Sequence, residues 1–541
     1  MTQRPTACNA LLVYPSFSRH SFWNYHETCQ VVGARYSAAP LGLITVAALL
    51  PEEWNVRLID CNVATLREAD LEWADLVLTG GMLPQQIDAL RVVRRAHDHG
   101  KPVVVGGPDV TASPEQYAEA EFLVLGEAED IITDFIAAWR GGAPGGRFQA
   151  AAFPDMTRSP IPRFELLDFR RYMHVGVQRS RGCPFNCEFC NVIELNGRRP
   201  RAKTTEQMLA ELEALHGLGY RGHVDFVDDN LIGDIRGVKP FLAALGHWLR
   251  AKGDPFEFTT EATINLAEDE ELLGLMQDAN FFAIFVGVET PDIATLIQTQ
   301  KRQNTRRDIT ESIHRIYRAG MFVNAGFVIG FDSEEGSVAE AMTACIEDTA
   351  IPVCMVGLLY ALPTTQLARR LEREGRLQAD HGKHAAETDV DQCTTGLNFE
   401  TRRPKRDILT DYRRVLESIY RPASFFARVE RMARELDVSR NRYRGSLRAT
   451  LRDLRSFGRI CWRLAVRDRA TRGPFLHSVW DCLRRNPSAI RMSVSMAALY
   501  LHYGPFAREM DRRLREQLET LPATELPEVR LEVAMATEAA L

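Results

Sequence analysis

Two successive stretches of this chain alternate short apolar runs with amphipathic helical periodicity, and this alternation sets the fold class. In the first stretch, residues 1–145, it predicts five buried strands with helices between them. Such alternation is typical of a doubly wound, open α/β sheet, which binds ligands at the carboxyl ends of its strands. The predicted strands are 10–14, 56–60, 76–79, 103–105 and 122–125.

The second stretch, residues 171–395, predicts six further strands, each followed by a helix. Between the two stretches, Gly and Pro are too frequent in residues 141–170 for a regular element, so we expect a linker at residues 146–170. Six βα units are too few to close an eight-stranded barrel, and the sequence therefore predicts a partial (βα)6 barrel. The predicted strands lie near 174–180, 222–227, 256–261, 282–287, 322–329 and 353–359.

The last part, residues 400–541, loses the strand signal and predicts a mostly helical domain. Residues 401–541 carry 29 Lys plus Arg against 17 Asp plus Glu, although the whole chain has a formal charge of −6. This basic excess is either a solvated face, a surface for peripheral contact with the inner face of the membrane, or, with least support, a nucleic-acid surface. No apolar run spans a bilayer and no signal peptide precedes the chain, so we expect a cytoplasmic protein.

Three of the eleven cysteines are crowded together just after a predicted strand. Cys183, Cys187 and Cys190 have the spacing C-x3-C-x2-C. Structural zinc takes four ligands in a closed tetrahedron, so these thiolates would need a distant fourth ligand. They suit a 4Fe–4S cluster that leaves one iron open to chelate a substrate. A zinc knuckle completed elsewhere in the chain, or a set of plain buried cysteines, is the alternative.

The triplet has an aromatic residue, Phe189, before its last cysteine and opens a six-unit βα barrel. In these features residues 170–395 resemble the radical S-adenosylmethionine (SAM) superfamily. The resemblance implies that the open iron binds the amino and carboxylate groups of SAM, that Phe189 contacts the cofactor, and that one electron cleaves SAM to methionine and a 5′-deoxyadenosyl radical. It also implies a reductant such as flavodoxin or ferredoxin, and it assigns no catalytic side chain.

Four strand-end residues lie where that superfamily holds SAM. Asp229 follows the second barrel strand, where the family often has a Gly-Gly-Glu stretch for the SAM amino group. Glu261 and Glu289 end the third and fourth strands, and their carboxylates suit ribose hydroxyls or the ammonium; a helix cap or a surface ion pair is the alternative. Gly330 lies in a stretch that resembles the family's G-x-I-x-G-x-x-E adenine strand, with the acid displaced to Glu334.

The first domain has no G-x-G-x-x-G after its first strand, which argues against NAD. Its turn motifs resemble instead the Rossmann-like cobalamin-binding domain that is fused to one class of radical SAM enzymes. The D-x-H-x-x-G motif of a lower histidine ligand is absent, and His99 is a near miss. Ordinary strand-to-helix turns are the alternative for these loops. The residues that the resemblance assigns to cobalamin are Gly81, Met82, Gly107, Pro108, Gly126 and Glu127.

The domain order resembles the branch of cobalamin-dependent radical SAM enzymes that contains the hopanoid C-2 methylases. It implies a 4Fe–4S cluster, SAM and cobalamin, and methylation of an unactivated carbon in a small, lipidic, hopanoid-like substrate. No side-chain base removes a proton from such a carbon, so the cofactors carry the difficult step. Two alternatives stay open: a tetrapyrrole or natural product that is methylated, cyclised or rearranged, and an RNA methylthiotransferase with a second cluster on Cys8, Cys29 and Cys61.

Overall fold

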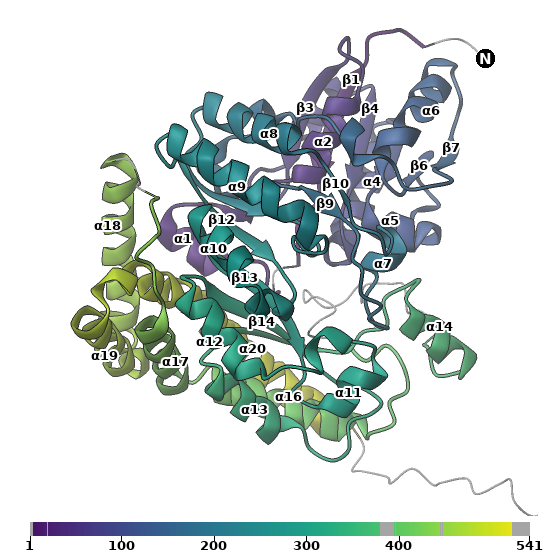
Figure 1. The fold of residues 1–541 in the computed structure, drawn as a ribbon. Helices are drawn as coiled ribbons and strands as arrows, with labels where there is room; N and C mark the ends of the chain where they lie inside the picture. Colours follow the sequence, from purple (N-terminus) through teal and green to yellow (C-terminus); the bar gives the residue numbers. More distant parts are fainter. Residues whose placement is uncertain are drawn as a thin grey trace, which may run out of the picture.

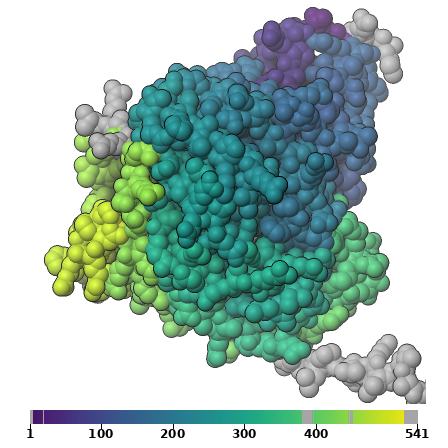
Figure 2. All heavy atoms as spheres, viewed as in Figure 1, coloured from purple at the N-terminus to yellow at the C-terminus, as the bar shows by residue number. Residues whose placement is uncertain are grey.

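The fold is that of a computed structural model, which describes residues 4–18, 20–378, 394, 396–443, 445 and 447–521. The end of the predicted C-terminal domain, 522–541, and the end of the predicted barrel domain around 379–393 lie outside the described residues. Figure 1 shows the first sheet at the upper right, the barrel in the centre and the C-terminal helices at the lower left. The space-filling view in Figure 2 shows the same three regions packed against one another.

The first sheet has six parallel strands in the order β3-β1-β4-β5-β6-β7, which confirms the doubly wound α/β fold. The chain starts at β1, adds β3 on one side and then winds outward on the other side. The strands are β1 (Asn9–Tyr14), β3 (Asn55–Asp60), β4 (Leu76–Gly80), β5 (Val103–Gly106), β6 (Phe122–Leu125) and β7 (Gly146–Gln149).

Helices cover both faces of this sheet. Helices α2 (Leu41–Leu49) and α6 (Ala128–Arg140) pack on one face. Helices α3 (Glu68–Trp73), α4 (Gln86–Asp98) and α5 (Pro108–Ala112) pack on the other. A strand buried on both sides is apolar at every position, and this is why the sequence predicts these strands well.

Strand β7 shows that our expectation of no regular element in residues 146–170 is wrong for 146–149. The strand pairs in parallel with β6, from Phe122 opposite Gly146 to Leu125 opposite Gln149. It needs a partner on one side alone because it lies at the sheet edge. A Cβ at Gly145 would lie 2.6 Å from the Glu121 carbonyl oxygen, so glycine allows the two backbones to approach. The glycines that suggested a linker therefore serve strand pairing.

The second sheet is an open partial barrel of seven parallel strands in the order β15-β14-β13-β12-β11-β8-β2. Six strands match the predicted ones: β8 (Tyr172–Val177), β11 (Gly222–Phe226), β12 (Phe256–Glu261), β13 (Phe281–Glu289), β14 (Phe322–Ile329) and β15 (Val353–Leu358). The helices that connect them form the outer layer (Figure 1): α8 (Thr205–Gly217), α9 (Ile235–Ala251), α10 (Glu270–Asp278), α12 (Ile309–Arg318) and α13 (Ala339–Asp348).

The seventh barrel strand, β2 (Tyr36–Ala38), comes from sequence that we assigned to the first domain. It pairs with β8 at the barrel edge, with Tyr36 opposite Tyr172. Just before it, the Trp23 ring lies 5.7 Å from the ring of Phe285 on the inner face of β13. This part of the first stretch therefore belongs to the barrel rather than to the first sheet. A three-residue strand has too short a pattern to be predicted.

The C-terminal region is helical, as the sequence predicts. Its helix α16 packs on α13, and its last helix packs on α1 (His26–Val32), so the layer lies against the barrel. In the part of the chain that the structure describes, no helix combines the length and apolar character needed to span a bilayer. The helices are α16 (Lys405–Ile419), α17 (Pro422–Glu435), α18 (Leu447–Cys461), the π-helical η8 (Trp462–Arg467), α19 (Arg469–Arg485) and α20 (Ile490–Thr520).

Candidate active site

The carboxyl ends of the two sheets face each other. Helix α5, which follows β5 of the first sheet, contacts α7 (Val192–Leu195), which follows the cysteine triplet. Arg181 bridges the two regions: its guanidinium lies 2.6 Å from a Glu127 oxygen and 2.9 Å from a Glu129 oxygen. All three side chains are at most 14% exposed, so water screens this bridge little. The bridge holds the first sheet against the cysteine loop.

Side chains at the end of β11 hold the start of the cysteine loop. The buried Asp228 carboxylate accepts hydrogen bonds from the backbone N–H groups of Arg179, at 2.9 Å, and Ser180. Asp229 accepts from the backbone N–H of Gly182 at 3.3 Å, so one oxygen of this predicted SAM contact also fixes the loop. Gly182 has φ of +93°, and a Cβ there would lie 2.8 Å from the Gly197 carbonyl oxygen. This position therefore requires glycine.

Cys183 and Cys190 both receive backbone hydrogen bonds. The N–H of Phe185 lowers the pKa of Cys183 and the N–H of Val192 lowers that of Cys190, although burial, the larger effect, leaves both pKa values raised, that of Cys190 to about 12. The charge of Cys187 also raises the pKa of both thiols, which places the three sulfurs near one another. Donors aimed at sulfur stabilise thiolates bound to iron. Because burial raises the pKa of Cys183 and Cys190, binding a cluster must release the protons of these two thiols.

Two residues that the sequence does not single out also face the triplet. Gln303 Nε2 donates to Cys187 Sγ at 3.5 Å, and the buried Oε1 of this amide has no hydrogen-bond partner among the residues that the structure describes. The Lys301 ammonium is buried 2.7 Å from a Glu289 oxygen. Burial lowers its pKa, but Glu289 and the Cys187 and Cys190 sulfurs raise it more, so it stays charged. A cation and an amide donor beside three thiolates fit an anionic iron–sulfur cluster.

A closed zinc site is not formed by the side chains that the structure describes. Among them, no group of three or more His, Cys, Asp or Glu is gathered to hold a single metal ion. Structural zinc needs such a group with four members. The cysteine triplet is not gathered into such a group either, so the case for a cluster rests on the spacing of the cysteines and on Gln303 and Lys301 beside them.

Phe189 and Gly330 come together at the rear of the cysteine loop. The Phe189 ring packs edge-to-face on Phe331 with the ring centroids 5.6 Å apart, next to a pocket that leaves room for about one water. Gly330 has φ of +108°, and its N–H donates to a Glu334 oxygen at 2.9 Å. The acid that the sequence shows displaced to Glu334 therefore caps the end of β14. The adenine contact predicted for Gly330 stays a prediction, since a Cβ at this position would meet the Leu397 side chain at 2.8 Å.

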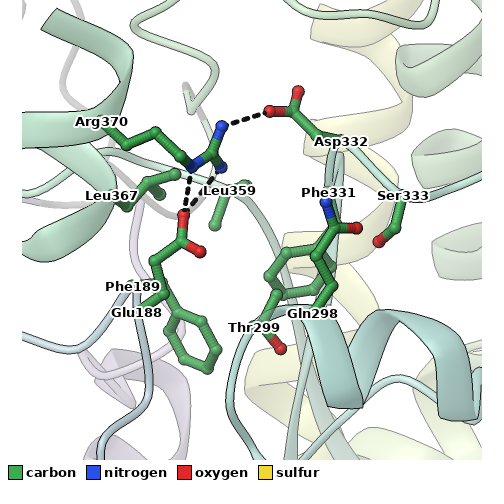
Figure 3. Close-up of a pocket in the computed structure, with 10 residues that line it drawn as sticks. All are labelled: Glu188, Phe189, Gln298, Thr299, Phe331, Asp332, Ser333, Leu359, Leu367 and Arg370. Carbon is green, nitrogen blue, oxygen red and sulfur yellow. Dashed lines mark hydrogen bonds and ion pairs between the residues drawn. The ribbon is translucent and has the colours of Figure 1, made fainter. Parts of the chain in front are cut away.

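Ion pairs hold this rear wall together (Figure 3). The Arg370 guanidinium from α14 (Gln366–Arg373) lies 2.7 Å from Glu188 of the cysteine loop and 2.9 Å from Asp332. Arg376 holds the other oxygen of Asp332 at 2.6 Å. The backbone N–H of Leu367 donates to the Glu188 carbonyl at 2.9 Å. Helix α14 therefore fixes the cysteine loop from the side opposite to the first domain.

The predicted carboxylates Glu261 and Glu289 have different surroundings. Glu289 is paired with Lys301, as described above, so the ion-pair alternative describes its geometry. Glu261 has no side-chain hydrogen bond or ion pair to any residue that the structure describes, and it keeps accessible surface at the mouth of the barrel. Burial, with Asp229 and Asp225 nearby, raises the pKa of Glu261 to about 8. A cation bound beside Glu261 would relieve this repulsion.

A polar layer deeper in the barrel was not predicted. The His223 Nε2 atom lies 2.7 Å from the Thr259 hydroxyl, which donates to Asp225 at 2.5 Å, and His174 stacks on His223 with ring centroids 4.8 Å apart. Burial lowers the pKa of both histidines and raises that of Asp225, and each shift favours the uncharged form of its group. Polar residues at alternate positions of buried strands were the signal that could have identified it.

The loops assigned to cobalamin lie at the carboxyl edge of the first sheet. Gly107 has φ of +96° and begins α5, with Pro108 in the first turn. Its Cβ would lie 3.3 Å from the backbone nitrogen of Gly81, so these two loops touch. Met82 is 47% exposed, and a Cβ on Gly126 would meet no atom within 4 Å. The edge thus presents exposed backbone and one flexible apolar side chain, which fits a large planar ligand.

Glu127, His99 and the cysteines of the alternative second cluster do not face the edge assigned to cobalamin. The Glu127 carboxylate is held by Arg181 and Arg201 in the bridge described above, rather than exposed to a ligand. His99 follows α4 and precedes β5, so it lies at the amino edge of the sheet, away from these loops. Cys8 precedes β1, Cys61 follows the parallel β3, and Cys29 lies on α1 against Met173. Since six residues of strand span about 20 Å, these cysteines cannot share one cluster.

Comparisons with known proteins agree with this arrangement. The chain matches the family models of the B12 binding domain at residues 29–136, the Radical SAM superfamily at 177–343 and a domain of unknown function, DUF4070, at 365–516. It is 40% identical over 511 residues to an uncharacterized methyltransferase of Synechocystis sp., which covers 94% of each chain. It is 37% identical over 391 residues to the hopanoid C-2 methylase of Rhodopseudomonas palustris, which covers 71% of this chain and 73% of the relative.

A solved structure shares the fold. The cobalamin-dependent SAM radical enzyme OxsB, with aqua-cobalamin and SAM bound, matches 95% of this chain and 81% of its own with a TM-score of 0.59 and 15% identity. At this identity the match concerns the fold alone.

Proposed function

This chain belongs to the cobalamin-dependent radical SAM methyltransferases, and on that premise we propose that it methylates an unactivated carbon of a small, lipidic, hopanoid-like substrate. A 4Fe–4S cluster and SAM supply radical chemistry, and cobalamin supplies a methyl carrier. The observation that carries the proposal is the opposition of the cysteine loop and the glycine loops of the first sheet, held by the buried Arg181 bridge.

We assign the cluster to Cys183, Cys187 and Cys190. Gln303 donates a hydrogen bond to the Cys187 sulfur, and Lys301 places a positive charge beside the triplet. The Glu289 carboxylate neutralises Lys301 and fixes its position. Electron delivery then requires a small protein of the flavodoxin or ferredoxin type, which we propose as the partner.

We assign the SAM site to the rim between the cysteine loop and the ends of β11, β12 and β14. The unpaired Glu261 and the neighbouring Asp229 offer negative charge to the positively charged SAM. Phe189 and Gly330 offer an aromatic ring and a bare backbone to its adenine. Cobalamin would lie on Gly81, Met82, Gly107, Pro108 and Gly126, whereas Glu127 would support this site from behind through Arg181.

The inner face of the barrel supports an apolar substrate with a polar end. Strand alternation places Val227 and Phe285 on this face, and Val227 and Trp23 keep 37% and 39% of their side-chain surface accessible. The partly buried His223–Thr259–Asp225 chain lies below them and offers hydrogen-bonding groups to a polar end of the substrate. The 37% identical hopanoid C-2 methylase is in agreement with a lipidic substrate.

The test is anaerobic reconstitution of the full chain with iron, sulfide and cobalamin. Optical spectra should show both cofactors, and mass spectrometry of hopanoid-containing lipid extracts treated with the protein and SAM should show a product heavier by one methylene. Pigment extracts run in parallel distinguish a tetrapyrrole substrate. Deoxyadenosine formation without a methylated lipid would overturn the substrate proposal and leave the enzyme class in place.

A further inference from the structure

The helices α18, η8 and α19 expose a concentrated set of apolar side chains. Fifteen large hydrophobic residues are exposed in the described part of the chain, and seven of them lie between residues 451 and 483. Trp462 and Trp480 are 63% and 66% exposed. Scattered exposed hydrophobics are ordinary, but a concentration of them on three successive helices indicates a binding surface. We call it the α18–α19 surface: Leu451, Leu454, Trp462, Val466, Leu476, Trp480 and Leu483.

This surface is the outer face of well-packed helices. The opposite face of the same helices is buried, at Ile460, Leu464, Phe475 and Cys482, and packs on α17, α20 and α1. The exposed residues recur at intervals of three, four or eight positions, so each helix presents them as a stripe. Figures 1 and 2 place these helices at the edge of the molecule, away from the first domain.

Positive charge surrounds the apolar stripes. Residues 447–485 contain ten Arg and three Asp, with neither Lys nor Glu. Arg455, Arg467, Arg469 and Arg484 are exposed and make no ion pair with residues that the structure describes, whereas most arginines of the barrel rim are paired. Tryptophan and leucine flanked by arginine match the interface of an anionic bilayer, where indole rings lie at the level of the headgroups.

We propose that the α18–α19 surface docks the protein peripherally on a bilayer of anionic lipids. A second copy of the chain fits poorly, because a two-fold contact would place the unpaired arginines of one surface against those of the other. RNA would pair with arginine but would leave the leucines exposed to water. The docking itself does not depend on the reaction. It extends the proposed function, because docking would bring the enzyme to the bilayer in which a lipidic substrate is dissolved.

Sedimentation of the full-length protein with vesicles tests the docking. We expect binding to phosphatidylglycerol vesicles, little binding to phosphatidylcholine, and a loss of binding at high salt, since each basic residue near such a surface adds about 1 kcal/mol, or roughly fivefold. Trp462→Ala with Trp480→Ala should lower the partition coefficient between vesicles and buffer at least about tenfold, because the variant lacks the two indole rings that we expect to bury apolar surface among the headgroups. Arg455→Glu with Arg484→Glu should lower it by a similar factor at low salt.

Matched controls keep the outcome interpretable. Leu218→Ala removes an exposed apolar residue of the barrel, and Arg94→Glu reverses an exposed arginine of α4. Both should bind like the unmodified chain. Equal vesicle binding by the tryptophan variant, or a dimer in solution that this variant dissolves without any vesicle binding, would overturn the proposal. Deoxyadenosine formation, measured without lipid, reports separately on the proposed function.

Discussion

The mouth of the barrel and the facing edge of the first sheet differ in how they are built to hold a ligand. The barrel mouth is crowded with charge: Asp228 and the Lys301–Glu289 pair are buried, and the unpaired Glu261 lies accessible beside them. The opposite edge is made of glycine turns, among them Gly107 and Gly126, with φ of +96° and +94°. A charged cofactor is held by side chains of opposite charge, whereas a large planar cofactor is held by a backbone surface of matching shape. Substitutions in the two regions should therefore impair the binding of different cofactors.

The largest effect should come from the barrel side. Cys187→Ala removes one of three proposed ligands, so we expect loss of the cluster and of deoxyadenosine formation, with cobalamin still bound. Iron content, the optical spectrum and deoxyadenosine by chromatography measure this. Cys345→Ala, on the outer helix α13, is the control and should keep all three. Full deoxyadenosine formation by Cys187→Ala would refute the cluster assignment.

The next effect concerns the bridge between the two regions. Arg181→Gln leaves Glu127 and Glu129 buried without their shared partner, at a cost of about 3–5 kcal/mol in the free energy of unfolding. We expect deoxyadenosine to form still, while methyl product per deoxyadenosine falls at least about tenfold because the two faces are no longer held together.

Arg158→Gln is the matched control for the bridge. Arg158 pairs with Asp130 of α6, but these side chains are 65% and 33% exposed, so the change should cost no more than about 1 kcal/mol. Denaturant unfolding and the product ratio are measured on both variants. An unchanged product ratio in Arg181→Gln would show that the bridge stabilises the fold without aligning the cofactors.

A smaller effect is expected from a substitution that alters the first-sheet edge alone. Gly107→Ala forces a Cβ into the left-handed region and against Gly81, which costs about 1–2 kcal/mol and moves the loop. Gly100→Ala is the control: Gly100 has φ of +63°, and a Cβ there would meet no atom within 4 Å. This variant therefore has the backbone strain but does not alter the loops assigned to cobalamin. We expect weaker cobalamin retention on gel filtration in Gly107→Ala alone. Equal cobalamin loss in both variants would count against the assigned edge.

The smallest expected effect is on the pH dependence of SAM binding. The Glu261 carboxyl, with a pKa of about 8, is mostly neutral at lower pH, and a cation beside it favours the ionised form. SAM affinity should therefore rise from about pH 6 to about pH 8, by at most about tenfold per pH unit. Glu261→Gln should flatten this rise, and the exposed Glu271→Gln should not. A rise of the same slope in Glu261→Gln would remove Glu261 from the site.

The parts of the molecule that the sequence predicts are those with local signals. Most of the eleven predicted strands of the two sheets are buried and mainly apolar, and the cysteine spacing is visible in the sequence. Strands β2 and β7 lie at sheet edges and depend on partners far along the chain. Lys301 and Gln303 reach the cysteines through tertiary contact, so no spacing reveals them. The roles of Glu127 and Glu289 depend on partners that only the fold supplies.

The most direct test of the central claim, that two cofactors act on one substrate between these faces, uses SAM with a deuterated methyl group. The account predicts a product that carries the labelled methyl, formed together with deoxyadenosine and in proportion to the cobalamin bound per chain. Labelled product at full yield from protein that contains no corrinoid would contradict it.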